Sequence, residues 1–168
     1  MLFFGCKTET KENDEEINET TQKNKTERTA FLIGDVDNDK ITDTAYVNEK
    51  PNSEVKIKFS KNIPEITLTS LGSVIKETQD LNGDKANEII IFSRTHEGWW
   101  NYVSVWTFKK GKWKELASVK GFIDDDRDFE NRIVKENGKY YLIGEDQWNE
   151  DEKGEFVKTK VRIKKNKA

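Results

Sequence analysis

Two segments of this 168-residue chain share one spacing of oxygen-bearing side chains. Loop one covers residues 35–43 (DVDNDKITD), and loop two covers residues 80–88 (DLNGDKANE). In both loops a carboxylate or amide stands at positions 1, 3, 5 and 9, and a lysine stands at position 6. A tight loop with alternate inward-facing oxygens suits a hard cation such as Ca²⁺, which takes roughly six to eight oxygen ligands.

The spacing therefore predicts that each loop is a calcium site. Side chains at positions 1, 3, 5 and 9, together with the backbone carbonyl of position 7, would supply most of the ligands, and water the remainder. The predicted ligands are Asp35, Asp37, Asp39, Ile41 and Asp43 in loop one, and Asp80, Asn82, Asp84, Ala86 and Glu88 in loop two. Loop one has four carboxylates and loop two has three, so charge alone predicts tighter binding in loop one. The alternative is a pair of acidic turns without metal, because Asp, Asn and Gly are common turn residues.

The flanks of the loops exclude an EF-hand. That motif needs a bidentate Glu at position 12 and a helix on each side. Position 12 is Tyr46 in loop one and Ile91 in loop two. The neighbouring residues 31–33, 44–47 and 89–92 are rich in β-branched and aromatic side chains, which favour strands. The predicted unit is a strand, a calcium loop and a second strand.

This unit resembles the FG-GAP (VCBS-type) repeat, the calcium loop of integrin α-chain propellers and of many bacterial surface proteins. The resemblance covers the two loops and their flanks, not the whole chain. Family loops have Gly at position 6, where this chain has Lys40 and Lys85, and Asn82 and Glu88 replace Asp in loop two. Glycine suits position 6 because it adopts positive φ freely. The resemblance implies bladed antiparallel sheets and a structural Ca²⁺.

Strand-like runs continue along the rest of the chain and predict an all-β fold. Asn137-Gly138, between two apolar runs, is typical of a type I′ hairpin turn, and Lys110-Gly111 marks a second hairpin. The predicted strands cover residues 30–33, 44–48, 54–60, 65–69, 74–77, 88–94, 101–109, 113–120, 132–136, 139–145 and 155–163.

The two loops start 45 residues apart (35 to 80), close to the length of a four-stranded propeller blade. We therefore expect blade-like antiparallel sheets in a partial or small β-propeller over residues 29–164, followed by a frayed tail at 165–168. Because propellers typically have at least about four blades, a β-sandwich is the alternative.

The N-terminal segment indicates a lipoprotein. Cys6, the only cysteine, follows the apolar residues 1–5 (MLFFG), and an apolar stretch ending in Gly-Cys resembles the end of a bacterial lipoprotein signal peptide, whose Cys is lipidated. Five residues are too few for a complete signal, so residues 1–6 are interpreted as a signal remnant. The alternative is an ordinary N-terminus with one free thiol.

Residues 7–28 extend the lipoprotein interpretation. They contain one aliphatic residue, Ile17, and no aromatic residue, so they cannot bury enough apolar surface to order themselves. We expect a disordered tether that holds the folded domain clear of a membrane. The predicted location is the bacterial cell envelope, either anchored in the outer membrane, periplasmic or on the cell surface.

Composition excludes several other functions. The 29 basic and 32 acidic side chains give a net charge of −3, which argues against general nucleic-acid binding. His96 is the only histidine and Cys6 lies in the predicted anchor, so no metal cluster of histidines and no nucleophilic triad is predicted. We therefore expect a protein that is not an enzyme. The acidic residues 124–128 are predicted to form a solvated turn.

Trp99 and Trp100 are candidate contacts for a partner. Adjacent residues of a strand face opposite sides, so at least one of the two rings can be exposed. An exposed aromatic ring suits sugar stacking or a protein contact, whereas packing of both rings in the interior is the alternative.

These observations predict a secreted or cell-envelope β domain that binds structural Ca²⁺ and acts as a binding module. Its partner would be an envelope glycan or protein. Two alternatives stay open. The first is a periplasmic inhibitor of a cell-wall hydrolase, since some such inhibitors resemble this calcium-loop plan, and the second is a glycan-acting enzyme.

Overall fold

The computed structural model describes residues 28–50, 54–122 and 129–165, and its regular structure is almost entirely β. The strands pair only with antiparallel neighbours. They are β1 (Arg28–Leu32), β2 (Thr44–Lys50), β3 (Glu54–Phe59), β4 (Ile66–Thr69), β5 (Ser73–Glu77), β6 (Ile89–Arg94), β7 (Trp100–Lys109), β8 (Lys112–Phe122), β9 (Ile133–Glu136), β10 (Lys139–Glu150) and β11 (Phe156–Arg162), with one 3-10 turn, η2 (Phe129–Arg132), before β9.

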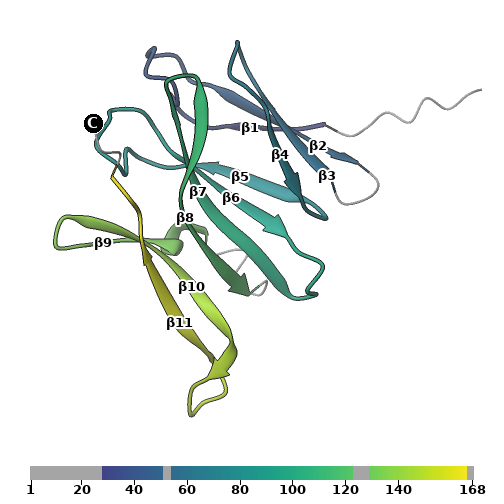
Figure 1. Cartoon of the computed structure of the whole chain (residues 1–168), viewed down its shortest axis with the longest axis vertical. Helices are drawn as coiled ribbons and strands as arrows, with labels where there is room; N and C mark the ends of the chain where they lie inside the picture. Colours follow the sequence, from purple (N-terminus) through teal and green to yellow (C-terminus); the bar gives the residue numbers. More distant parts are fainter. Residues whose placement is uncertain (1–27, 51–53, 123–128, 166–168) are drawn as a thin grey trace, which may run out of the picture.

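The described residues form three sheets (Figure 1). The first sheet has the order β1-β2-β3-β4, the middle sheet β5-β6-β7-β8, and the last sheet β11-β10-β9. The predicted all-β antiparallel class is confirmed, whereas the described residues do not show a closed ring of blades. None of the helical structure in these residues is long and apolar enough to cross a membrane.

The 45-residue spacing of the loops belongs to a larger repeat. β1 begins at residue 28 and β5 at residue 73, while β2 begins at residue 44 and β6 at residue 89, so both intervals are 45 residues. Each of the first two sheets is a four-stranded meander with its acidic loop between the first and second strands. The two loops therefore occupy equivalent places in two equivalent units.

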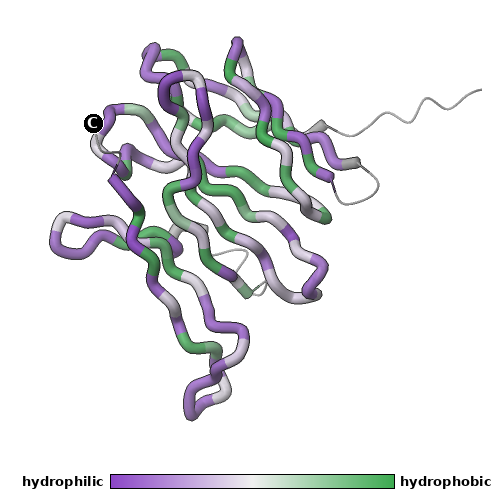
Figure 2. The backbone as a smooth tube through the Cα atoms, in the orientation of Figure 1, coloured by the Kyte–Doolittle hydropathy of each residue, from purple (hydrophilic) through white to green (hydrophobic). Residues whose placement is uncertain are grey.

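Two hydrophobic clusters hold the sheets together, and β6 contributes to both. Its side chains alternate between the faces of the middle sheet, as the two-residue period of a strand requires. Ile89 and Ile91 pack with the first sheet, whereas Ile90 and Phe92 pack towards the last sheet. Figure 2 shows hydrophobic segments along the strands of the middle sheet and hydrophilic ones at the turns.

The last sheet approaches the middle sheet closely at Gly144 of β10. A Cβ atom at this position would come within 2.5 Å of Val119 Cβ and would also collide with the carbonyl oxygen of Lys120. Glycine is therefore required for the contact between β10 and β8.

A buried carboxylate also joins these two sheets. Glu145 of β10 accepts hydrogen bonds from Arg132 Nη1 at 2.7 and 2.9 Å, from Phe122 N at 2.9 Å and from Lys158 Nζ at 2.7 Å. These donors come from the ends of η2 and β8 and from β11. Loss of one partner from such a buried pair typically costs about 3–5 kcal/mol, so Glu145 is a structural residue.

Both predicted hairpin turns are confirmed. Asn137 and Gly138 have φ of 49° and 72°, and Lys110 and Gly111 have φ of 52° and 74°, the positive values that a type I′ turn needs. The eleven predicted strands are all found. The predicted end of β10 at Glu145 is too early, because the strand continues, through an irregular register, until residue 150 pairs with residue 156.

Some predictions lie outside the described residues. These are the signal remnant with Cys6, the tether up to residue 27, the acidic turn at 124–128 and the last residues of the tail.

Candidate metal centres

The two acidic loops lie next to each other at one end of the first and middle sheets (Figure 1). Loop one connects β1 to β2, and loop two connects β5 to β6. The backbone N–H of Asn87 in loop two donates to the carbonyl oxygen of Asp35 in loop one at 2.8 Å. A cavity of about 300 Å³ between the loops is lined by Asp37, Asn38, Asp84, Ala86 and residues 108–111 of the β7–β8 hairpin.

Both loops have the same backbone turn. Positions 4 and 6 have positive φ in each: Asn38 at 63° and Lys40 at 71° in loop one, Gly83 at 89° and Lys85 at 74° in loop two. Lysine thus adopts at position 6 the left-handed conformation that glycine adopts freely. A lysine in this conformation places strain in the turn of each loop.

The carboxylate at position 1 organises this turn. In loop one, Asp39 N and Lys40 N donate to Asp35 Oδ1 and Oδ2 at 3.0 and 2.8 Å. The same bonds in loop two run from the amides of positions 5 and 6 to Asp80 Oδ1 and Oδ2, at 3.2 and 3.0 Å. The two loops differ in sequence at six of nine positions, and the position-1 carboxylate accepts the same pair of backbone hydrogen bonds in both.

The carboxylate at position 9 is fully buried in both loops. Asp43 Oδ2 accepts the backbone N–H of Val36 at 3.2 Å, and Glu88 Oε2 accepts that of Leu81 at 2.6 Å. Each bond runs from position 2 to position 9 and closes the loop, so this acid is fixed relative to the strand that follows.

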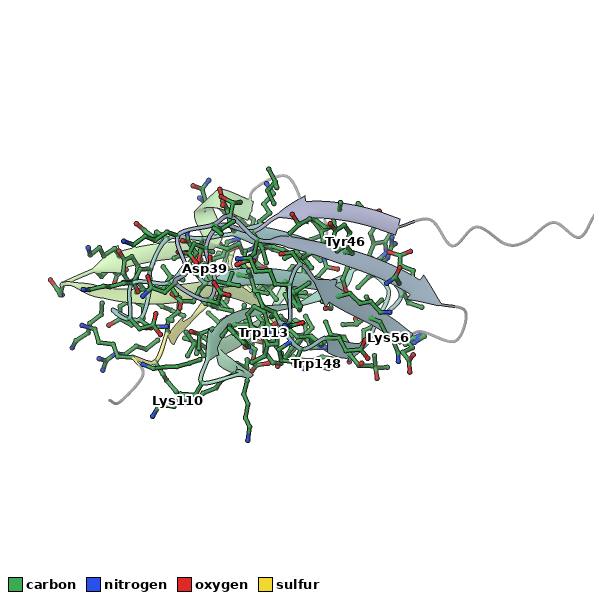
Figure 3. All side chains as sticks on the ribbon, turned by 90° about the horizontal axis from the view of Figure 1, so that it is seen from above. Asp39, Tyr46, Lys56, Lys110, Trp113 and Trp148 are labelled. Atoms are coloured by element: carbon green, nitrogen blue, oxygen red, sulfur yellow. The ribbon has the colours of Figure 1, made fainter. Side chains whose placement is uncertain are left out.

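Within each loop, three carboxylates converge. Oxygen atoms of Asp35, Asp37 and Asp39 lie within 4.8 Å of one another, as do those of Asp80, Asp84 and Glu88. Such clusters can hold a metal ion. In Figure 3 the label of Asp39 lies beside a group of oxygen atoms drawn in red.

Loop one receives an ammonium group from the β3–β4 turn. Lys61 Nζ lies 2.6 Å from Asp39 Oδ2, 3.2 Å from Asp43 Oδ1 and 4.0 Å from Asp37 Oδ1. The hydrogen bond from Lys61 lowers the pKa of Asp39 from its usual value. Burial, together with repulsion from Asp43, raises the pKa of Asp37.

Loop two has a different interior, centred on Asn82 and Glu88. The Asn82 side chain is 4% exposed, and its Nδ2 donates to Glu88 Oε1 and, at 3.0 Å, to Thr107 Oγ1. Its Oδ1 is the only buried side-chain polar atom without a hydrogen-bond partner in the part of the chain that the structure describes. Burial raises the pKa of Glu88 to about 7, against the lowering effect of the bond from Leu81.

The structure therefore brings together three of the four predicted carboxylates of loop one and all three of loop two. Asp43 is outside the loop-one cluster and contacts Lys61, and Asn82 contacts the loop-two cluster through Nδ2. At position 7, whose backbone carbonyl is the predicted ligand, the Ile41 side chain is exposed and that of Ala86 is buried. Lys61 and Thr107 are contacts that the sequence did not indicate. Lys61 is 22 residues from Asp39, and no local pattern marks a contact over that distance.

The two predicted partner residues differ in exposure. Trp99 is 65% exposed, whereas Trp100 is buried, with ring centroids 5.4 Å from Phe122 and 4.8 Å from Phe156. Trp148, labelled in Figure 3, is 84% exposed and was not among the predicted contacts. It lies in the part of β10 that the sequence did not predict.

The fold and the loops define an all-β protein of three antiparallel sheets with two acidic clusters able to hold a metal ion. No protein-family model matches the chain, and neither the curated proteins nor the solved structures include a significant match. The comparisons therefore assign no family to this fold and these loops.

The strain at position 6 predicts the effect of Lys85→Gly. Because a side chain in the left-handed region costs roughly 1–2 kcal/mol and glycine does not, the variant should be more stable by about 1 kcal/mol. Urea unfolding in EDTA measures this change without a contribution from metal. The control is Lys114→Gly, an exposed lysine in β8, where glycine should destabilise by roughly 0.5–1 kcal/mol. Equal destabilisation by both substitutions would show that position 6 is not strained.

Proposed function

We propose that this protein is a non-catalytic β domain of the cell envelope or the extracellular space that binds structural Ca²⁺ and a glycan or protein partner. The observation that carries the calcium assignment is the convergence of carboxylates in a turn that forms twice with the same hydrogen bonds. The resemblance of the loops to FG-GAP (VCBS-type) repeats supports the same assignment.

The donor set favours Ca²⁺ over other metals. Its candidate ligands are carboxylate, amide and carbonyl oxygens, which suit hard cations. Zinc prefers Cys and His, and this chain has one residue of each, neither of them in loop one or loop two. Mg²⁺ demands a nearly ideal octahedron and loses water reluctantly, whereas Ca²⁺ accepts irregular cages of carboxylates.

A bound cation would stabilise the fold because it neutralises repulsion between the carboxylates. Extracellular calcium modules bind with Kd of roughly 10⁻⁴–10⁻³ M. At 100 times Kd, one site that is absent from the unfolded chain adds about 2.7 kcal/mol. The free energy of unfolding of a typical domain is only about 5–15 kcal/mol, so this contribution is large.

The calcium assignment is tested by thermal unfolding in EDTA, in 10 mM Ca²⁺ and in 10 mM Mg²⁺. Calcium should raise the melting temperature of the wild type by roughly 5–10 °C and magnesium should have much less effect. Asp80→Asn, which keeps the size of the side chain and removes its charge, should lose most of the calcium response. Glu152→Gln, an exposed substitution in the β10–β11 turn, serves as the control and should retain it. Melting curves that coincide in EDTA and Ca²⁺ would contradict the assignment.

The partner role rests on the exposed ring of Trp99, since Trp100 is buried in the aromatic cluster. A large exposed ring provides the stacking surface that sugars and protein hot spots use. Envelope glycans should be retained on an array by the wild type and retained at least tenfold less by Trp99→Ala. Equal retention by both proteins would remove Trp99 from this role.

A further inference from the structure

Loop one already contains a cation that belongs to the protein. The ammonium of Lys61 contacts Asp39 and Asp43 at 2.6 and 3.2 Å and lies 4.0 Å from Asp37. These acids occupy positions 5, 9 and 3 of the loop, three of its predicted calcium ligands. A divalent cation that used the same oxygens would have to displace the ammonium.

The β3–β4 turn holds Lys61 in this place. Ser60, its neighbour, donates from Oγ to Asp43 Oδ1 at 3.0 Å and accepts the backbone N–H of Thr44 at 3.0 Å. The backbone N–H of Ser60 also donates to the carbonyl oxygen of Thr44 at 2.8 Å. Since these bonds fix the turn beside the end of loop one, Lys61 is presented to the carboxylates at a high effective concentration.

Loop two differs from loop one in its lysine contact and in its buried amide. Lys109 Nζ lies 3.8 Å from Asp84 Oδ2, beyond hydrogen-bond distance, so it does not fill the cluster as Lys61 does. Asn82, at position 3, is nine-tenths buried and its Oδ1 has no partner among the described residues. A buried oxygen without a donor costs free energy. A cation bound in loop two would satisfy Oδ1 after the amide turned, because Nδ2, which donates to Glu88, is the end of the amide that faces the acids in this structure.

We propose that Lys61 is a tethered competitor that excludes divalent cations from loop one, so that the protein binds one Ca²⁺, in loop two. The proposal rests on the proposed calcium function and deepens it. It reverses the order of affinity that the number of carboxylates predicts. Lys61 reduces the formal charge of the loop-one acids from −4 to −3, which equals that of the three acids in loop two when Glu88 is ionised. The carboxylate advantage of loop one is therefore cancelled.

The experiment is calorimetric titration of the metal-free protein with Ca²⁺, using the wild type, Lys61→Met and Asp80→Asn. Methionine keeps the unbranched stem and removes the ammonium. The wild type should bind one ion, Lys61→Met two, and Asp80→Asn none at the wild-type affinity. The double variant Lys61→Met with Asp80→Asn should bind one ion, in loop one. Circular dichroism verifies that each variant is folded.

Two further variants test whether the number of bound ions depends on the contact between Lys61 and the loop-one acids. Lys61→Arg keeps the positive charge and should bind one ion. Lys58→Met removes an equal charge from an exposed position of β3 and should also bind one ion.

The possible failures are distinguishable. Two ions in the wild type, or one ion in both the wild type and Lys61→Met, would overturn the proposal while the calcium function stands. Binding of Ca²⁺ by Lys61→Met but not by the wild type would support the role of Lys61 and contradict calcium binding in loop two. Absence of binding by every variant would overturn both.

Discussion

The acidic loops depend on the hydrogen bonds that the position-1 carboxylate accepts from the backbone of its own turn. Asp35 and Asp80 each bind the amides of positions 5 and 6, which fixes two residues in the left-handed region. This turn draws the other carboxylates together, so the bonds that form the loop also create its charge repulsion.

The protein must offset that repulsion, and its two loops do so differently. Loop one uses the ammonium of Lys61. Loop two buries Glu88, and this burial raises the pKa of that acid to about 7.

The loops are also part of the fold. Position 2 of each loop, Val36 or Leu81, is a buried core residue whose backbone N–H donates to the acid at position 9. Val36 belongs to the cluster between the first and middle sheets, and Leu81 to the cluster between the middle and last sheets. A cation at loop two would therefore stabilise the packing of the middle sheet against the last one. The bond from Asn87 N to Asp35 O joins the two loops, so their geometries are coupled.

The features that sequence predicts here are those that depend on neighbours in the chain. Strand alternation, the Asn137-Gly138 turn and the spacing of acids within nine residues are local, and the structure reproduces them. The features that sequence does not predict depend on distant residues. Lys61 reaches loop one through the pairing of β2 with β3, and Trp100 is buried by Phe156, a residue of another sheet. The end of β10, residues 146–150, has Trp148 as its single apolar side chain, and residue 150 pairs with residue 156 of β11. Such contacts require the assembled fold.

The most direct measurement is an anomalous-difference electron-density map from crystals grown in Ca²⁺ and soaked in Tb³⁺, a heavier ion that also prefers oxygen ligands. Our account predicts one strong peak in loop two, about 2.3–2.6 Å from oxygens of Asp80, Asp84 and Glu88. It also predicts that Asn82 turns its Oδ1 towards the ion, and that loop one has no peak, with Lys61 among its acids. A peak in loop one, with or without one in loop two, or no peak in either loop at saturating ion, would contradict the account.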